Sequence, residues 1–533
     1  MQRTISLWQR ARWPFRMGLA AVLVIGSGLG VRAIITNLVL VSALHTAQAE
    51  HLDQASLETL IQNNQTEEAF AEAFEHGDKL FETVFNAVDG VGANVGQGQR
   101  FTHVPRADLR GPGEWANHNP PRATGPNASA CNACHNTPSD DGAGGSFANV
   151  HRDPEHSGIL SHFIQRNTPH LFGGGAVQRL AEEMSSDLST TRSAMVNAAC
   201  AGPFGTVRSA ALKTKGVYFG TIAARRVSSG SVCPLAPGRR FTVDSRGVRG
   251  VDPDLVVRPF QWKGSVAFIR DFNRDAAHNE LGIQAVEIAG DGVDGDFDGV
   301  ADELSIGDQT ALAVYLSAQP RPLTITELAA LGLAPAQSPT ELASIANGGV
   351  QFHNAACDTC HKPILVLNDA IFSEPSQNPN FRDSRFPAGQ EPRARGVDPA
   401  FPVTYDLTQD LPDNQITVGD QVVHLGNHVS NGRGGALIAL FGDLKRHDLG
   451  PGIAEGIDEA GTGCSTFLTE NLWGVGATAP YLHDGRATTL TEAILEHGGE
   501  GASSRITFNN LSAPNQADLI AFLNNLTLFK QQQ

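Results

Sequence analysis

Apolar residues recur at helical spacing between residues 52 and 88. Four aromatic residues there lie three to four residues apart or at multiples of that spacing, at Phe70, Phe74, Phe81 and Phe85. Side chains at this spacing share one face of a helix, so the pattern predicts amphipathic helix. A second helical pattern covers residues 161–200 and is interrupted at glycines 173–175.

The segments between the helical patterns favour turns. Residues 90–126 are rich in Gly, Pro and Asn and are expected to form a long loop. Residues 203–258 have a mixed pattern, which predicts loops with some strand. We therefore expect little regular strand in the chain.

The second half of the chain repeats features of the first half in the same order. The helical pattern at residues 308–316 matches the one at 515–523, with Gln, Leu, an aromatic residue and Leu at the same spacings. A Gly-x-x-x-Phe segment from Gly77 to Phe81 has a counterpart, one residue shorter, from Gly349 to Phe352.

A third correspondence links Trp262-Lys263-Gly264 with His483-Asp484-Gly485. Three matches in one order imply two domains of one kind. The boundary is expected at residues 319–322, where two prolines follow a helical pattern.

Each half also contains one Cys-x-x-Cys-His pentapeptide. Two thiols three positions apart can each add to a vinyl group of a haem, and the His that follows then binds the iron. No further Cys pair is present to complete a tetrahedral zinc site. The pentapeptides therefore predict two covalently bound haem c groups, at Cys131, Cys134, His135 and at Cys357, Cys360, His361.

Together the repeat and the pentapeptides predict the fold class. We expect a mainly α protein with two tandem cytochrome c-like haem domains, long loops and little strand. The N-terminal domain would cover residues 50–320 and the C-terminal domain residues 323–533.

Composition and charge limit the classes of partner. The chain has 533 residues, of which 41% are hydrophobic and 18% are charged, as is typical of globular proteins. Its formal net charge is −17 and we expect no basic patch, which argues against nucleic acid as a partner. A basic or dipolar electron-transfer protein remains compatible with this charge.

The N-terminus has the features of an export signal. Arginines precede a long apolar stretch over residues 17–44 that only Arg32 breaks, and Ala47-Gln48-Ala49 then matches a cleavage site. Residues 1–49 are therefore expected to be a signal peptide. The alternative is an uncleaved membrane anchor, because the stretch is long enough to span a bilayer. Either way, the rest of the chain is expected in the periplasm, where haem c is attached.

Three cysteines remain outside the pentapeptides, namely Cys200, Cys233 and Cys464. In an oxidising compartment a Cys200–Cys233 disulfide is plausible and would close a loop rich in Gly, Ser and Arg. Cys464 would then be an odd thiol, which we expect to be buried.

The two irons are expected to differ in their second ligand. His497 lies fourteen residues beyond His483, whereas Ala276 lies fourteen residues beyond Trp262, its counterpart in the first half. Because alanine cannot bind iron, we expect a bis-His second haem and a first haem with an open or water-bound face. The alternative for His497 is a surface histidine near a helix end.

Three residues are candidates for chemistry at the open face: Trp262, His278 and Glu280. A carboxylate or imidazole there can take a proton from peroxide and return it to the leaving oxygen. The alternatives are simple packing for Trp262, a solvent-exposed helix residue for His278, and a surface ion pair for Glu280.

These motifs resemble the di-haem cytochrome c peroxidase superfamily, most nearly its branch of di-haem oxidoreductases described as peroxidases or thiol oxidoreductases. The resemblance runs from about residue 68 to the C-terminus. Besides both pentapeptides, it is carried by RPFQWKG at 258–264, LWGVG at 472–476, APYLHDGR at 479–486 and HGGE at 497–500.

The resemblance implies that the N-terminal haem reacts and that the C-terminal haem takes in electrons. Trp262 and Glu280 fall near the positions of a Trp and a distal Glu in bacterial peroxidases, although the interval here is two residues shorter. His497 stands where those enzymes use Met and where tryptophylquinone-forming relatives use Tyr. In this respect the chain is similar to the di-haem rubber oxygenases and fatty-acid dioxygenases, whose reactive haem handles O₂.

The segment from Leu472 to Arg486 is expected to shape the second haem site. Arg486 would pair with a haem propionate, and Trp473 would lie on the electron path between the haems. For both residues, packing alone is the alternative.

An acidic stretch over residues 291–303 has the spacing of a calcium loop. Carboxylates fall at loop positions one, three, five and nine, with Gly299 at position six. Position twelve is Ser305, so the bidentate Glu is missing. The pattern predicts a calcium site formed by Asp294, Asp296, Asp298 and Asp302. The alternative is a solvated acidic turn without an ion.

The leading hypothesis is a periplasmic peroxidase that reduces H₂O₂ at the His135 haem. A small donor protein would supply electrons through the second haem. The alternative is a dioxygenase that inserts O₂ into an unsaturated lipid or isoprenoid, which an apolar channel and a missing distal acid would favour. A third possibility is a non-catalytic di-haem electron carrier, which requires two ligands on both irons.

Overall fold

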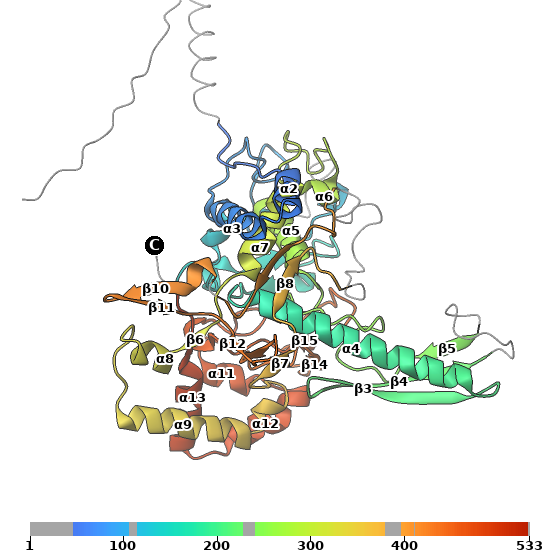
Figure 1. The fold of residues 1–533 in the computed structure, drawn as a ribbon, viewed down its shortest axis with the longest axis vertical. Helices are drawn as coiled ribbons and strands as arrows, with labels where there is room; N and C mark the ends of the chain where they lie inside the picture. Colours follow the sequence, from blue (N-terminus) through green and yellow to red (C-terminus); the bar gives the residue numbers. More distant parts are fainter. Residues whose placement is uncertain (1–45, 106–114, 228–239, 379–395, 410, 531–533) are drawn as a thin grey trace, which may run out of the picture. The chain divides into compact units, whose positions relative to one another are not determined.

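The helical patterns that the sequence repeats form two helix pairs of the same construction. In this computed structural model, α3 (Thr66–Glu82) packs against α7 (Ile306–Ser317) in the first half of the chain. In the second half, α9 (Pro339–Asn354) packs against α13 (Ala513–Asn524), as Figure 1 shows. The structure describes residues 46–105, 115–227, 240–378, 396–409 and 411–530.

The remaining helices are mostly short. They are α2 (Gln54–Gln62), α4 (Gly174–Ala201), α5 (Ile269–Ala276), α6 (Val286–Ala289), α8 (Ile325–Ala330), α11 (Leu490–Leu495), α12 (Ala502–Asn509), the π-helical turn η6 (Ala277–Leu281) and the 3₁₀ turns η2 (Trp115–Asn117), η3 (Cys131–Ala133), η4 (Ser146–Ala148), η5 (Leu160–His162), η7 (Cys357–Thr359), η8 (Pro412–Asn414), η9 (Val475–Ala477) and η10 (Gly499–Gly501).

A glycine allows each helix pair to approach closely. A Cβ atom added at Gly77 of α3 would lie 2.3 Å from the carbonyl oxygen of Ala311 in α7. A Cβ atom added at Gly348 of α9 would lie 2.0 Å from the carbonyl oxygen of Asp518 in α13. Both contacts are far shorter than van der Waals distance, so only glycine fits at either crossing.

The close contact at Gly348 shows that this residue, and not Gly349, is the counterpart of Gly77. Gly348 lies four residues before Phe352, the same interval that separates Gly77 from Phe81. The expected counterpart, Gly349, faces only the ring of Phe522, and a Cβ atom added there would lie 3.7 Å from that ring. The second Gly-x-x-x-Phe segment is therefore the same length as the first.

The expected fold class is wrong, because strand is more abundant than predicted. The described residues are 35% helix and 16% strand, arranged in several small sheets. The strands are β1 (Val150–Arg152), β2 (Ile164–Arg166), β3 (Val207–Thr214), β4 (Val217–Arg226), β5 (Phe241–Asp244), β6 (Leu323–Thr324), β7 (Leu365–Leu367), β8 (Ile371–Glu374), β9 (Val403–Asp406), β10 (Gln415–Val418), β11 (Gln421–His424), β12 (Val429–Ser430), β13 (Ala436–Ile438), β14 (Arg446–Asp448), β15 (Thr466–Leu468) and β16 (Leu526–Thr527).

Two physical reasons explain the missed strands. Most are two to four residues long, too short to show an alternating pattern. The longest, β3 and β4, form an antiparallel sheet with β5, and the pairing of β3 with β4 is irregular between Ala211 and Lys213. A bulge of this kind shifts the alternation of inward and outward side chains, which hides the strand pattern.

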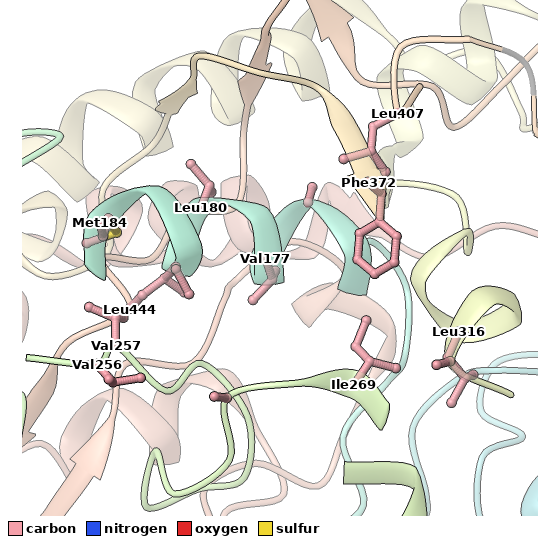
Figure 2. Packing of buried hydrophobic residues seen from close by; sticks show 14 of the residues in the cluster. Val177, Leu180, Met184, Val256, Val257, Ile269, Leu316, Phe372, Leu407 and Leu444 are labelled. Carbon is pink, nitrogen blue, oxygen red and sulfur yellow. The ribbon is translucent and has the colours of Figure 1, made fainter. Parts of the chain in front are cut away.

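The main hydrophobic core contains residues from both halves of the chain. Figure 2 shows Val177, Leu180 and Met184 of α4 within this core. Around them pack residues of the first half and of the second half, including Val256, Val257, Ile269, Leu316, Phe372, Leu407 and Leu444. Residues 47–533 accordingly form one compact unit.

The expected domain boundary lies between two elements. Residues 319–322 connect α7 to β6, and β6 pairs with β16 near the end of the chain. A smaller hydrophobic cluster belongs to the second half alone and contains Phe352, Leu519 and Leu523. The two-domain division remains a prediction.

Some expectations concern residues at or beyond the described part. The predicted apolar export segment lies outside the described residues, as does Cys233. Cys200, the last residue but one of α4, is disulfide-bonded. Cys464 is half-buried with a free thiol. Across the described residues, no helix combines the length and apolar character needed to span a membrane.

We predict that the crossing glycine is far less tolerant than its neighbour. Gly348→Ala forces the backbone of α13 away from α9, so the free energy of unfolding should fall by about 1–3 kcal/mol. Gly349→Ala is the matched control, because its new methyl group meets only the Phe522 ring. Urea unfolding of the haem-loaded variants measures both, and equal losses would contradict the assignment.

Candidate haem sites

The first pentapeptide lies on a tight 3₁₀ turn. The backbone N–H groups of Cys134 and His135 both donate to the carbonyl of Cys131, at 3.1 Å and 3.2 Å. The turn thus places both thiols and the imidazole along one wall of a cavity of about 170 Å³. Burial raises the pKa of Cys131 to about 12 and that of Cys134 to about 11, so both thiols are protonated at neutral pH.

The hydrogen bonding of the His135 imidazole leaves one ring nitrogen available to bind a metal. Its Nδ1 donates to the carbonyl oxygen of Gly142 at 3.2 Å. Burial lowers its pKa to about 4, so the ring is neutral near pH 7. A neutral ring that donates at Nδ1 keeps the lone pair on Nε2 free for a metal ion.

The second pentapeptide repeats this arrangement. Cys357–Thr359 form η7, and His361 donates from Nδ1 to the carbonyl oxygen of Phe441 at 3.2 Å. Burial lowers the pKa of His361 to about 4. The cavity here is larger, about 320 Å³, and is lined mostly by apolar side chains.

In the second cavity His497 faces His361. The centroids of the two rings are 6.4 Å apart, and Nδ1 of His497 donates to the carbonyl oxygen of Ala493 at 2.8 Å. Two imidazole nitrogens that each lie about 2 Å from one metal ion place their ring centroids about 6 Å apart. The pair therefore has the spacing of two ligands on opposite sides of one iron.

Among the described residues, the first cavity shows no equivalent second ligand. Ala276 lines it, whereas the described residues around the cavity include no histidine besides His135 and no methionine. The aromatic and aliphatic residues around His135 include Phe81, whose ring centroid is 6.1 Å from that of the imidazole. The donor sets of both cavities fit a haem, and they differ on the face opposite the pentapeptide histidine.

Glu280 reaches the first cavity from the π-helical turn η6. Its backbone carbonyl accepts from the N–H groups of Asn127 and Ala128, which fixes the turn beside the segment that leads into the pentapeptide. Its carboxylate Oε2 is buried and has no hydrogen-bond partner within the described structure. Burial raises the pKa of Glu280 to about 7, against the opposing effect of the Arg152 guanidinium.

Arg152 is held away from full pairing with Glu280. Its Nη1 lies 4.0 Å from Oε1 of Glu280, whereas its Nε donates to Glu459 at 2.8 Å. Glu459 also accepts from Arg166 at 2.8 Å. Arg166 in turn pairs with Glu455.

This charged network joins the two halves and was missed at the sequence level. Lys263 and Nε2 of His483 each lie 3.7 Å from Glu455. Arg152 and Arg166 come from the paired strands β1 and β2, roughly 290–310 residues before their glutamate partners. Charged residues so far apart in sequence carry no periodicity or spacing that could have identified them.

Two tryptophans line the larger cavity, and one of them also lines the smaller one. Trp262 lines both cavities and donates from Nε1 to the carbonyl oxygen of Asn167 at 2.9 Å. Trp473 is buried, lines the larger cavity, and packs its ring against Gly173, where a Cβ would come within 2.6 Å. Its carbonyl oxygen accepts from Nε2 of His170 at 3.1 Å.

Two predicted site residues are not brought into the cavities. His278 is buried outside the lining of the first cavity, where burial and the neighbouring Arg122 lower its pKa. The π-helical turn places Glu280 in the cavity and His278 out of it. Arg486 donates to the Asp484 carboxylate at 2.7–3.1 Å and to the carbonyl of Gly452, and it does not line the larger cavity.

The acidic loop brings three of its four predicted carboxylates together. Ligand oxygens of Asp294, Asp296 and Asp298 lie within 4.8 Å of one another. Asp302 instead accepts from the N–H of Gly292 at 2.7 Å. The pKa of Glu303, a residue that the sequence pattern did not single out, is raised by burial and by the charge of Asp296.

The carboxylates of this loop carry more buried negative charge than their cations balance. One oxygen each of Asp296 and Glu303 is buried without a hydrogen-bond partner in the described structure. Burial raises the pKa of Asp296 to about 7 and that of Glu303 to about 10. Arg122 pairs with Asp296 at 3.3 Å and Arg100 with Asp298 at 2.6 Å.

Comparison with known proteins supports the resemblance that the motifs carry. Residues 415–526 match the model of the family described as "Di-haem oxidoreductase, putative peroxidase". This segment contains Trp473, His483 and His497 but neither pentapeptide. The match confirms the likeness to the di-haem peroxidase branch and supports a peroxidase-like di-haem oxidoreductase with haem as its cofactor.

A solved structure described as a MauG-like protein associated with microbial copper homeostasis also aligns with the chain. The identity is 15%, the alignment covers 54% of this chain and 75% of that chain, and the TM-score is 0.25. A score this low carries no argument about fold or site. No curated protein matches the chain.

Proposed function

We propose that the protein is a periplasmic di-haem peroxidase that reduces H₂O₂ at the haem held by His135. Electrons from a small donor protein would be relayed by the haem held by His361 and His497. One observation carries the proposal: the cavity of His361 offers a second imidazole, and the described lining of the cavity of His135 offers none. When bound, each haem supplies an iron that exchanges electrons, and an iron with an open face also binds peroxide or O₂.

Covalent attachment would use the four pentapeptide cysteines. Each pair lies on a 3₁₀ turn beside the imidazole that would bind the iron, which supports attachment of both haems through thioether bonds. The hydrogen bonds from His135 to Gly142 and from His361 to Phe441 fix the ring orientation needed for ligation.

Glu280 would move the proton that peroxide reduction requires. Its unpartnered Oε2 accepts a proton from hydrogen peroxide and returns it to the departing oxygen, which leaves as water. A pKa near 7 suits both steps, because the group then gains and loses a proton with little cost near neutral pH. Trp262 borders the same cavity and would restrict access from the side of the second site.

Trp262 and Trp473 would assist electron transfer between the haems. Both line the larger cavity, and Trp262 also lines the smaller one. Aromatic rings in the wall between two redox sites shorten the distance over which an electron must pass through saturated groups. The donor is proposed to be a small basic or dipolar protein, in keeping with the net charge of −17.

A dioxygenase acting on an unsaturated lipid or isoprenoid is the second candidate. The mostly apolar lining of the larger cavity favours it. Glu280 argues for peroxide instead, since a dioxygenase needs no distal acid. An electron carrier is less favoured, because no second ligand borders the cavity of His135.

We also propose a structural Ca²⁺ ion held by Asp294, Asp296 and Asp298. The unpartnered oxygens of Asp296 and Glu303 support this site, because a divalent cation would balance their charge. Carboxylate oxygens are the ligands that Ca²⁺ prefers. The ion would tie the loop to η6, since Arg122 contacts both Asp296 and the carbonyl of His278.

The haem-loaded protein should show one high-spin and one low-spin ferric haem. EPR and optical spectra before and after one equivalent of peroxide test this, and peroxide should consume only the high-spin signal. His497→Ala should convert the low-spin haem to high spin, whereas the exposed His353→Ala should change nothing. A stable oxy-ferrous spectrum that ignores peroxide would instead favour the dioxygenase, and two low-spin haems would favour a carrier.

Removing the proton acceptor should slow peroxide reduction strongly. Glu280→Gln should lower kcat/KM for H₂O₂ by about 10²–10⁴-fold with both haems retained. In the wild type, kcat/KM should fall as pH drops below about 7, because Glu280 must be ionised to accept the proton.

Glu459 provides the matched variant for that experiment. Glu459→Gln removes a negative charge that raises the pKa of Glu280 and frees Arg152 to pair with it. The pH at which activity is half lost should therefore move lower in Glu459→Gln and be absent in Glu280→Gln. An unchanged profile in both variants would contradict the role given to Glu280.

Calcium removal should destabilise the protein. Because the ion binds only the folded loop, chelation with EGTA should lower the melting temperature, and added Ca²⁺ should restore it. Asp296→Asn should abolish the response, whereas Asp302→Asn should preserve it. Metal analysis that finds no Ca²⁺, with melting unaffected by EGTA, would refute the site.

A further inference from the structure

One segment of this acidic protein is strongly basic. Residues 192–249 contain ten Lys or Arg side chains and a single acidic one, Asp244. This corrects the expectation that the chain has no basic patch. The described part of the segment consists of the end of α4 and the sheet of β3, β4 and β5, and is called the arm below.

One face of the arm is covered and the other is open. Helix α4 packs along β3 and β4, as Figure 1 shows, and it covers the buried side chains Leu212, Phe219 and Ile222. The opposite face, called the outer face below, carries mostly small side chains. Its members on β3 and β4 are Val207, Ser209, Ala211, Lys213, Tyr218, Thr221, Ala223 and Arg225.

The cations of the outer face have no partner within the described residues. Lys213 lies opposite Tyr218 and Arg225 lies opposite Val207, and no ion pair or hydrogen bond of the Lys213 or Arg225 side chain is found there. By contrast, Lys215 at the hairpin turn pairs with Glu183 of α4. Tyr218 and Val207 are 51% and 54% exposed, so each free cation stands beside an exposed apolar group.

A segment of opposite charge lies near the start of the body. Residues 50–89 contain ten acidic side chains and one basic one, Lys79, which mirrors the composition of residues 192–249. On α3, Glu68, Glu72, Glu75 and Glu82 recur at helical spacing on the exposed side, while the other side packs on α7. We call this the acidic face; Val84, just beyond it, is 65% exposed.

We propose that the outer face of the arm of one copy of this chain docks on the acidic face of a second copy. The outer face carries the cations Lys213 and Arg225, whereas the acidic face carries four glutamates, of which only Glu75 is ion-paired within the described residues, with Lys79 at 3.0 Å. Opposite charge on two exposed faces is electrostatic complementarity of the kind that steers association. No ion pair between the described residues of the two segments forms within one chain. The exposed apolar groups beside both faces supply surface that such a contact would bury.

A second copy of the chain offers a partner to both charged faces, whereas an anionic membrane surface would bind only the basic one. A lipid surface would match the arm but leave the acidic face without a partner. In a contact between two copies, the arm of one copy and the acidic face of the other are each covered by a surface of opposite charge.

The association can be measured by sedimentation velocity of the haem-loaded protein. Self-association should be evident at about 50 mM NaCl and largely lost at about 500 mM, because screening shortens the reach of exposed charges. Arg225→Glu and Glu72→Lys should each weaken association about tenfold. Arg433→Glu and Asp420→Lys, exposed charges outside both faces, are matched controls that should leave it unchanged.

Mixing the variants makes the test specific. Combining Arg225→Glu and Glu72→Lys in one chain, or mixing the two single variants, should restore association, because each reversed face then meets a reversed partner. A wild type that stays monomeric at low salt, or controls that weaken association equally, would overturn the proposal. Binding to vesicles of anionic but not zwitterionic phospholipid, without self-association, would overturn it in favour of a membrane surface.

Discussion

The two candidate haem sites depend on one short segment that both of them share. Within residues 167–172, Asn167, Thr168, Pro169 and Leu171 line both cavities, and the segment is held by hydrogen bonds to groups from distant parts of the chain. The Asn167 carbonyl accepts from Trp262 and its N–H donates to the carbonyl of His483, while His170 binds the carbonyl of Trp473. Since each bond fixes a residue of one cavity relative to the other, moving this segment would disturb both sites together.

The sequence contained enough to point to both candidate haem sites, because the residues proposed to bind the irons lie in short local patterns. The pentapeptides form compact turns, and the repeat led from Trp262 and His483 to the contrast between Ala276 and His497. The same repeat suggested a glycine in each helix pair. It missed the register by one residue, since two adjacent glycines look alike in sequence and only the crossing backbone distinguishes them.

The features that could not be predicted from the sequence are contacts between residues far apart in the chain and the effects of local backbone geometry. Arg152 and Glu459 meet only in the folded chain, and no spacing rule connects them. His278 and Glu280 are two residues apart and were given similar roles, yet the π-helical turn sends them to different surroundings. The strands were underestimated because most are too short for an alternating pattern to be recognised.

The placement of Glu280 is best understood as a compromise within the charged network. A buried carboxylate without a close cation is unfavourable for folding, and Arg152 could relieve it by direct pairing. Instead Arg152 is engaged by Glu459, which together with Arg166 and Glu455 forms ion pairs that join strands β1 and β2 to the second half of the chain. The network thus stabilises the contact between the halves while it leaves Glu280 partly unpaired. A carboxylate kept in this state holds or releases a proton near neutral pH, which full pairing with Arg152 would prevent.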